Sequence, residues 1–383
     1  MKNFWTKLKT PASTRGDSPA SPNRGESTRG GPFFCLAPMA DVTDPAFRRI
    51  ISKYSHHGEA GGGPDVFWTE FVSADGLAHM ATAKGLSNDK GRKKLLINLK
   101  FSKNEHPIVA QIFGANPENI KKASALCAKL GFDGIDINMG CPDRAIEKQG
   151  AGAKMMQNQK LAGEIIKSAK EGAPNLPISV KTRLGYNKDE VDTWISFLLK
   201  QNLSALTIHL RTRKEMSKVP AHWELAKKIV TLRNKINKAS PIGLRPRATK
   251  IIFNGDVVSV EDGIKKAKAT GCDGIMIGRA IFGNPFFFSE KLQNHLTPKS
   301  PLLNKERGQG ERSQIEQKLK VLIEHTKLFE KLLGKYKSFA VMKKHFKAYV
   351  NGFDGAKELR IKLMETKNAK EVEKIINNFL KNH

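Results

Sequence analysis

Short apolar runs alternate with amphipathic segments along the chain from residue 33 to residue 290. The segments between the runs, such as 117–130 and 159–171, carry apolar residues at three- and four-residue steps, which indicates helices. Continuous apolar runs rich in β-branched residues are typical of parallel strands that are buried on both faces. The eight runs begin at Phe33, Asp65, Pro107, Gly134, Pro177, Ala205, Lys250 and Asp273.

Eight strand–helix units in roughly 260 residues predict an α/β fold, a (β/α)8 TIM barrel. A doubly wound open sheet is the alternative, but such sheets usually have fewer strands. After Arg312 the strand pattern stops, and apolar residues step by three and four again. We therefore expect a small C-terminal helical bundle after the barrel. Its two clearest apolar stripes are Ile315, Leu319, Leu322, Phe329 and Leu333, followed by Phe339, Met342, Phe346 and Tyr349.

Four segments rich in Ser, Pro, Gly and charged residues interrupt this pattern, at 10–32, 56–64, 241–247 and 298–312. They contain too few apolar groups to offset the entropy that ordering would cost. The pattern divides the chain into four parts. These are a disordered or inserted N-terminal segment (1–32), a barrel (33–297), a linker between domains (298–312) and a helical domain (313–383).

The chain is strongly basic, with 66 Lys and Arg against 37 Asp and Glu and a formal net charge of +29. Such a field attracts polyanions, of which nucleic acid is the commonest, although a general lysine excess is the simpler alternative. No run of about 18 apolar residues is present, so we expect no membrane-spanning helix. The first lysines lack the apolar stretch of a secretory signal. Four cysteines without a C-x-x-C pair argue against a zinc ribbon or a disulfide scaffold, and we expect a cytoplasmic protein without a metal.

Polar and hydrogen-bonding residues follow nearly every expected strand. Because TIM barrels build their sites at the carboxyl ends of the strands, we expect these residues to meet at one mouth. Gly255, Gly278 and Arg279 follow the seventh and eighth strands, where a phosphate group commonly binds. A lysine and a glutamine on the same rim suit a flat polar ring with a phosphate tail, such as flavin mononucleotide (FMN). Asn254 could instead be only a turn former before a glycine.

The ordered motifs of the chain resemble those of the tRNA-dihydrouridine synthases. The matching segments are LAPMADVTDPAFRR (36–49), TEFVSADGL (69–77), AQIFG (110–114), INMGCP (137–142), QGAGAKMM (149–156), VKTRLG (180–185), IHLRTR (208–213), FNGDV (253–257), IMIGRAIFGNPFFF (275–288) and MKKHFKAYVNGFDGAKELR (342–360). The resemblance implies an FMN-bound TIM barrel and a C-terminal helical domain that binds tRNA. It also implies reduction of uridine in tRNA to 5,6-dihydrouridine, with NADPH or NADH reducing the flavin, by a protein that we expect to be a monomer.

The resemblance assigns roles to individual positions. Cys141 matches the proton donor of the family. Beyond the resemblance, our candidates to hold the edge of the uridine are Asn138 and Arg183, those for its phosphate or neighbouring phosphates are Arg211 and Arg213, and the basic tail adds Lys343 and Lys344. The flavin would be held by Ala37, Pro38 and Met39 through the backbone, by Gln111, Lys181 and His209 around the ring, and by Asn254, Gly255, Asp256, Gly278 and Arg279 at the ribityl chain and phosphate.

The chemistry of the reaction explains a cysteine at the mouth. Reduction of the uracil C5=C6 bond needs a hydride at C6 and a proton at C5. A thiol with an ordinary pKa of about 8.5 is mostly protonated at neutral pH, so Cys141 can act as a general acid. A lone cysteine is more often a small buried hydrophobe, and we expect that role for Cys35, Cys127 and Cys272.

Two other functions fit part of the sequence. An FMN-dependent barrel oxidoreductase that acts on a small pyrimidine or a related small molecule would keep the flavin residues but would not need the basic tail. A non-catalytic RNA-binding protein would keep the charge and bind no flavin.

Overall fold

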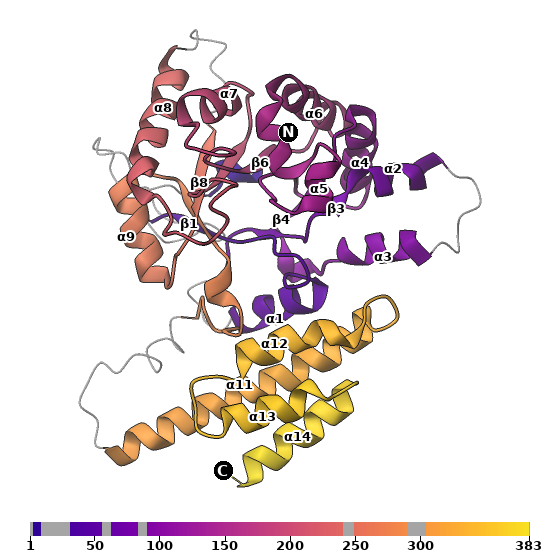
Figure 1. The fold of residues 1–383 in the computed structure, drawn as a ribbon, viewed down its shortest axis with the longest axis vertical. Helices are drawn as coiled ribbons and strands as arrows, with labels where there is room; N and C mark the ends of the chain where they lie inside the picture. Colours follow the sequence, from indigo (N-terminus) through magenta and orange to yellow (C-terminus); the bar gives the residue numbers. More distant parts are fainter. Residues whose placement is uncertain are drawn as a thin grey trace.

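The computed structural model describes residues 3–8, 31–55, 63–82, 90–239, 249–289 and 304–382. Eight parallel strands form a closed barrel in the order β1-β9-β8-β7-β6-β5-β4-β2, which confirms the predicted fold (Figure 1). A bridge between Cys35 and Val66 completes the ring between β1 and β2, and a short extra strand, β3 (Val72–Ser73), pairs with β4. The barrel strands are β1 (Phe33–Leu36), β2 (Phe67–Trp68), β4 (Ile108–Phe113), β5 (Gly134–Met139), β6 (Ile178–Arg183), β7 (Ala205–His209), β8 (Lys250–Asn254) and β9 (Gly274–Ile277).

Helices cover the outside of the barrel, as the three- and four-residue apolar spacing predicts. The helix α4 shows why they form where they do: the Asn116 side chain accepts the N–H of Asn119 at 3.1 Å, and Pro117 occupies the first turn. Its apolar face, including Ile120 and Cys127, is buried against the strands. The helices around the barrel are α1 (Pro45–Ser55), α2 (Ala74–Thr82), α3 (Lys90–Asn98), α4 (Pro117–Lys129), α5 (Arg144–Lys148), α6 (Gln159–Gly172), α7 (Ser196–Leu199), α8 (Ala226–Ala239) and α9 (Val260–Thr270).

The N-terminal residues close the bottom of the barrel. The segment predicted to be disordered, 1–32, contains a short 3-10 helix, η1 (Phe4–Thr6), whose Trp5 is only 2% exposed. The Trp5 ring packs against Phe33 and Trp68, with centroid distances of 5.8 Å to each. The expectation therefore fails for residues 3–8, because burial of one large indole offsets the entropy of ordering a short segment. Residues 9–30 lie outside the described part of the chain.

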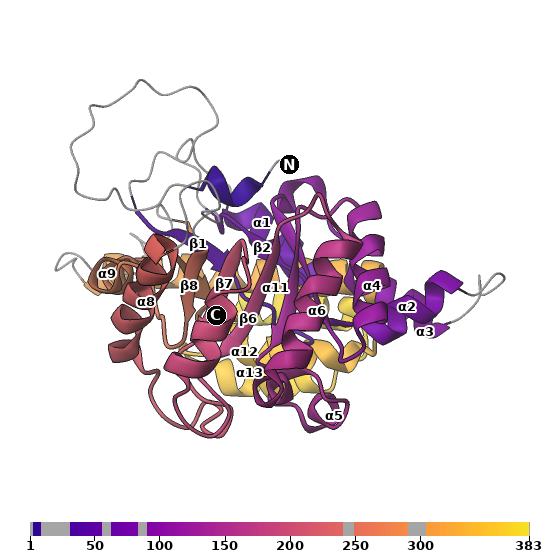
Figure 2. The same cartoon turned by 90° about the horizontal axis from the view of Figure 1, so that it is seen from above.

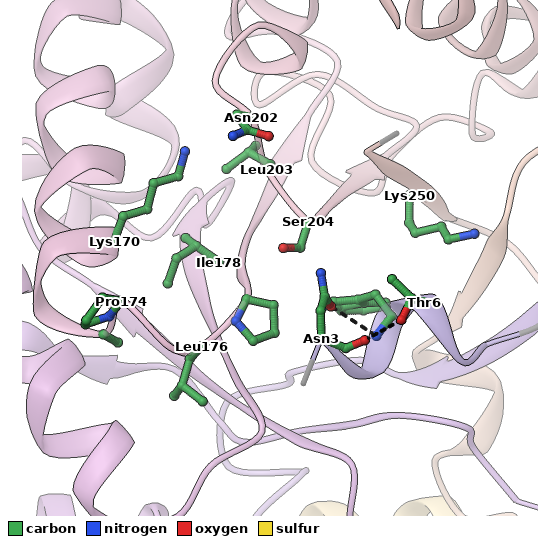
Figure 3. Close-up of a pocket in the computed structure, with 13 residues that line it drawn as sticks. Asn3, Thr6, Lys170, Pro174, Leu176, Ile178, Asn202, Leu203, Ser204 and Lys250 are labelled. Carbon is green, nitrogen blue, oxygen red and sulfur yellow. Dashed lines mark hydrogen bonds between the residues drawn. The ribbon is translucent and has the colours of Figure 1, made fainter. Parts of the chain in front are cut away.

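A hollow of about 480 Å³ lies beside this N-terminal segment (Figure 3). Asn3 and Thr6 lie on one side of it, and Asn202, Leu203 and Ser204, just before β7, lie on another. The hollow is therefore at the amino ends of the strands. Figure 2 shows the N-terminal residues at one end of the barrel and α5, which follows β5, at the other.

Four further helices form the C-terminal unit beside the barrel (Figure 1). They are α11 (Asn304–Leu333), α12 (Met342–Tyr349), α13 (Ala356–Met364) and α14 (Ala369–Asn382). The helix α11 begins inside the segment predicted to be a linker, so 304–312 is helical, while 298–303 lies outside the described residues, as do 56–62 and 241–247 of the other low-complexity segments. Ala46 and Ile50 of α1 join the core of this unit. Within the described residues, no helix is both long and apolar enough to cross a bilayer.

Two histidines are buried where this C-terminal unit meets the barrel. The ring centroids of His325 and His345 lie 4.6 Å apart, both residues are 0% exposed, and neither ring nitrogen of His325 has a hydrogen-bond partner within the described residues. Phe47 of α1 contacts both rings. Burial lowers the pKa of His325 to about 3 and, together with the nearby His325, lowers that of His345 well below its usual value. Both imidazoles are therefore neutral in the folded protein.

We expect acid to destabilise the protein through this pair. A histidine with a depressed folded pKa takes up its proton only in the unfolded state, so stability is full above about pH 6.5 and falls below it, by up to about 1.4 kcal/mol per pH unit for each histidine. Chemical unfolding at several pH values measures this effect. His325→Phe should reduce the loss between about pH 6.5 and pH 5. A variant with the same pH slope as the parent protein would contradict the assignment.

Candidate active site

The carboxyl ends of the strands open onto a cavity of about 720 Å³. This volume is within the usual range for cofactor and small-molecule sites. Ten of the eleven residues predicted to bind the flavin line the cavity, and Gln111 is the exception. The ten are Ala37, Pro38, Met39, Lys181, His209, Asn254, Gly255, Asp256, Gly278 and Arg279.

Lys181, on β6, gives the cavity a half-buried positive charge. Within the described residues, no hydrogen bond or ion pair of its ammonium group is present. Burial and the charge of Arg183 lower the pKa of Lys181 to about 8, while Asp136 and the Cys141 thiol act in the opposite direction. A half-buried ammonium group without a protein partner has lost part of its hydration, and a ligand that supplies an acceptor would stabilise it. Lys181 is therefore the most direct sign that this cavity binds a polar or anionic group.

A hydrogen-bonded network lies behind the cavity wall. The Gln111 amide donates to Asp136 at 2.7 Å and accepts from Asn138 at 3.0 Å, and the Ser179 hydroxyl donates to Asp136 at 2.6 Å. Burial raises the pKa of Asp136 to about 6, although these hydrogen bonds and Lys181 hold it lower than burial alone would. Both polar atoms of the Gln111 amide are thus engaged inside the protein. This residue supports the wall from behind.

Asn138, at the end of β5, connects this network to the loop that carries Cys141. Its side-chain oxygen accepts the N–H groups of Gly140 and Cys141, at 3.1 and 2.9 Å. A Cβ atom on Gly140 would lie 3.0 Å from the backbone of Thr182, so only glycine lets the loop pack so closely on β6. On the other side, the Cys141 carbonyl accepts the N–H of Ala153 at 2.9 Å. The loop is therefore fixed at both ends.

The Cys141 side chain is half-buried, whereas the other three cysteines are buried in the core. Burial raises the pKa of the Cys141 thiol above its ordinary value, so the group carries its proton at neutral pH. The thiol is close enough to influence the pKa values of Lys181 and Arg183. Cys127 and Cys272, whose pKa values burial raises to about 12, have the structural role that the sequence predicts. Cys141 does not line the cavity of about 720 Å³ itself, but it is the one cysteine of the four that is not buried in the core, and it lies close to Lys181, which does line it.

Polar contacts also connect the residues that follow β7, β8 and β9 at the cavity. Asp256 accepts from Arg211, from Arg279 at 2.7 Å and from the N–H of Ala221 at 2.9 Å, and these contacts, with Arg211 first, lower its pKa. Arg211 also lies 3.0 Å from Nε2 of His209. Because burial and surrounding cations lower the pKa of His209, the ring is neutral; its Nε2 accepts from Arg211, and the proton is on Nδ1.

The residues predicted to bind the substrate are mostly engaged within the protein. Arg183 donates to the carbonyls of Gly140, Thr212 and Met216, and Arg213 forms a two-point ion pair with Glu147. The Arg213 guanidinium also lies 5.1 Å from the ring centroid of Tyr186. In the C-terminal unit, the Lys344 ammonium lies 3.6 Å from Asp41, and Lys343 is half-buried. Asn138, Arg183 and Arg211 therefore hold the backbone of loops at the mouth through their hydrogen bonds.

Some residues of the site were not predicted from the sequence. Ser217, Val257, Val258, Met276 and Ala280 also line the cavity. Ser217 lies in the loop after β7, where nothing in the spacing marks it. Asp136 did have a signal, since a carboxylate in the middle of the apolar strand GIDINM must have a buried partner.

Comparison with known proteins identifies the family of the chain. The family model described as dihydrouridine synthase (Dus) matches residues 35–383. A probable tRNA-dihydrouridine synthase of Staphylococcus aureus strain Mu50 is 39% identical over 350 residues, covering 91% of this chain and 93% of the relative. The probable tRNA-dihydrouridine synthase 2 of Bacillus subtilis strain 168 is also 39% identical, over 354 residues, covering 91% and 94%.

Among solved structures, morphinone reductase superposes with a TM-score of 0.45 at 11% identity, covering 68% of this chain and 86% of that protein. The family match and the relatives extend over the barrel and the C-terminal helices alike. On these grounds the chain belongs to the dihydrouridine synthase family.

Proposed function

We propose that this protein reduces uridine in tRNA to 5,6-dihydrouridine with FMN as its cofactor and NADPH or NADH as the reductant. The observation that carries the proposal is the unpaired Lys181 ammonium, which faces the cavity and is electrostatically coupled to the Cys141 thiol. Family membership supports the reaction, and the relatives' names supply tRNA as the substrate.

The cavity residues fit FMN. Lys181 is placed to stabilise negative charge on the flavin ring, and the neutral His209 offers its Nδ1–H as a donor. Gly255 has a φ of 135°, and a Cβ there would lie 2.8 Å from Ala221, so glycine is required where the loop turns into the cavity. Arg279, whose side chain is 67% exposed, can reach a phosphate at the rim. When bound, reduced FMN supplies the hydride for C6 of the uracil ring.

The protein must then supply a proton to C5, and we assign this role to Cys141. Its thiol is protonated at neutral pH because burial raises its pKa, and Asn138 and Ala153 hold the backbone on which it stands. A positioned general acid of this kind typically accelerates a reaction by about 10²–10⁴-fold. A uridine stacked in a folded tRNA cannot reach this thiol, so the base must be turned out of its loop.

Basic residues around the mouth and on the C-terminal helices would bind the RNA backbone. Residues 311–383 contain 17 Lys and Arg against 9 Asp and Glu. This contribution is electrostatic and largely independent of sequence. The expectations of a monomer without a metal stay predictions.

Cys141→Ala should retain FMN and tRNA binding but lower the rate of dihydrouridine formation by about 10²–10⁴-fold, because only the proton donor is lost. Mass spectrometry of tRNA after single turnovers measures the product. Cys127→Ala, in the core of α4, is the matched control and should keep nearly the parent rate. Rapid product formation by the Cys141 variant would remove this residue from the proposed role.

The affinity for FMN should fall as the pH rises through about 8, the pKa of Lys181 in the free protein. The ammonium is charged below that pH and favours an electron-rich ligand, and this attraction disappears when the group loses its proton. Fluorescence titration should show a dissociation constant about tenfold higher at pH 9.5 than at pH 7. Lys181→Met should bind weakly at both pH values. A pH-independent affinity of the parent protein would contradict the assignment.

Binding of tRNA should weaken steeply with added salt, because each neutralised phosphate releases a counterion. Filter binding at several salt concentrations gives the slope of log affinity against log salt. Several phosphate contacts predict a loss of about 10³-fold between 50 and 200 mM salt. A salt-insensitive affinity, or full activity on a free pyrimidine nucleoside in place of tRNA, would favour the small-molecule oxidoreductase instead.

A further inference from the structure

A buried ion pair joins the C-terminal unit to the barrel. Lys337, which follows α11, has a side chain that is 6% exposed, and its ammonium lies 2.9 Å from Oε2 of Glu70 and 3.7 Å from Oδ1 of Asp41. Glu70 follows β2 at the mouth of the barrel, and Asp41 lies in the loop between β1 and α1. Burial alone lowers the pKa of Lys337, but Glu70, Asp44 and Asp41 raise it above its ordinary value, so the lysine is charged.

Glu70 connects this lysine to the backbone of the loop. One of its carboxylate oxygens accepts from Lys337, and the other accepts the N–H of Asp41. Asp41 has a φ of 52°, in the left-handed region that residues other than glycine adopt only when their surroundings hold them there. The contact with Glu70 is therefore part of what fixes the turn.

The turn that contains Asp41 continues directly into the cavity wall. The Met39 carbonyl accepts the N–H groups of Val42 and Thr43, each at 3.0 Å, and the Thr43 hydroxyl accepts the N–H of Met39 at 2.8 Å. Met39 lines the cavity together with Ala37 and Pro38. A contact made by the C-terminal unit thus reaches the cavity through one carboxylate and one turn.

We propose that Lys337 is a positioning residue for the cofactor. Through Glu70 and Asp41 it fixes the backbone of residues 37–39, so the C-terminal helices complete the flavin pocket in addition to contacting RNA. The proposal rests on the proposed function in taking FMN as the ligand. Lys344 makes a longer contact of 3.6 Å with Asp41 and is 40% exposed, so solvent screens it, and it contributes less.

The test compares Lys337→Met with a matched variant that breaks a different ion pair between the same two units. Lys53, on α1, lies 2.8 Å from Glu324, on α11, and neither residue contacts the loop or the cavity within the described structure. Two quantities are measured on the flavin-free protein: the dissociation constant for added FMN, and the rate of hydrogen–deuterium exchange in the peptide spanning 37–44. Thermal unfolding confirms that each variant is folded.

Lys337→Met should raise the FMN dissociation constant at least about tenfold and speed exchange in 37–44, because the turn loses its anchor. Lys53→Met should change neither, although it weakens the contact between the two units. Lys337→Arg keeps a cation beside Glu70 and should bind FMN within about threefold of the parent protein. Equal effects of the Met variants at 337 and 53, or unchanged exchange in Lys337→Met, would overturn the proposal.

Loss of a buried cation can prevent folding. If Lys337→Met does not fold, Glu70→Gln is measured in its place. This variant keeps the size of the bridging side chain but removes its charge, and it should raise the FMN dissociation constant at least about fivefold. An unchanged affinity would count against the proposal. If the parent protein itself binds no FMN, the proposed function fails, and exchange in 37–44 alone decides whether Lys337 fixes the loop.

Discussion

Closure of the ring of parallel strands is the constraint on which the site depends. A parallel barrel directs every carboxyl end to one rim, so residues far apart in the chain meet there regardless of their separation. Cys35 and Val66 complete the ring, and the pairing of β6, β7 and β8 places Arg183 beside His209 and His209 beside Asn254. The cavity of about 720 Å³ is the direct product of this register.

Many of the buried polar groups at this rim are accommodated because they hydrogen-bond to one another. Asp136, Gln111, Ser179 and Asn138 form a closed set of hydrogen bonds, and Asp256 holds two arginines. Lys181 has no such partner within the described residues. Of the two cations that line the cavity, Arg279 is paired with Asp256 and Lys181 is not, and the Asn138 end of the network fixes the loop that carries Cys141.

The C-terminal helices are part of the barrel's structure as well as a basic surface. Their core includes Ala46 and Ile50 of α1, and Lys337 reaches Glu70 at the mouth. The first contact falls on α1, and the second falls on Glu70 after β2, which in turn holds the loop between β1 and α1 that lines the cavity. The mouth of the barrel and the C-terminal helices are therefore held together by one continuous packing surface.

The sequence by itself determined the architecture and most of the candidate site. Buried parallel strands require long apolar runs, so the eight runs were visible, and the polar residues at their ends, from Lys181 to Arg279, followed from strand direction. Ordered motifs then indicated the family. Trp5 was missed because one indole in a polar segment produces no periodic signal, although its burial, with the Asn3 cap and the packing of Phe4 and Leu8, orders η1.

Only the tertiary structure decided how the polar residues are shared among ligand, loop and core. Gln111 and Lys181 looked equivalent in the sequence, but Gln111 is fully engaged by Asp136 and Asn138, whereas Lys181 faces the cavity. Arg183 and Arg211 likewise hold neighbouring loops, and Lys337 pairs with a carboxylate 267 residues away. Such pairings depend on distances between strands and units that are remote in the chain, so the local spacing of residues along the sequence cannot predict them.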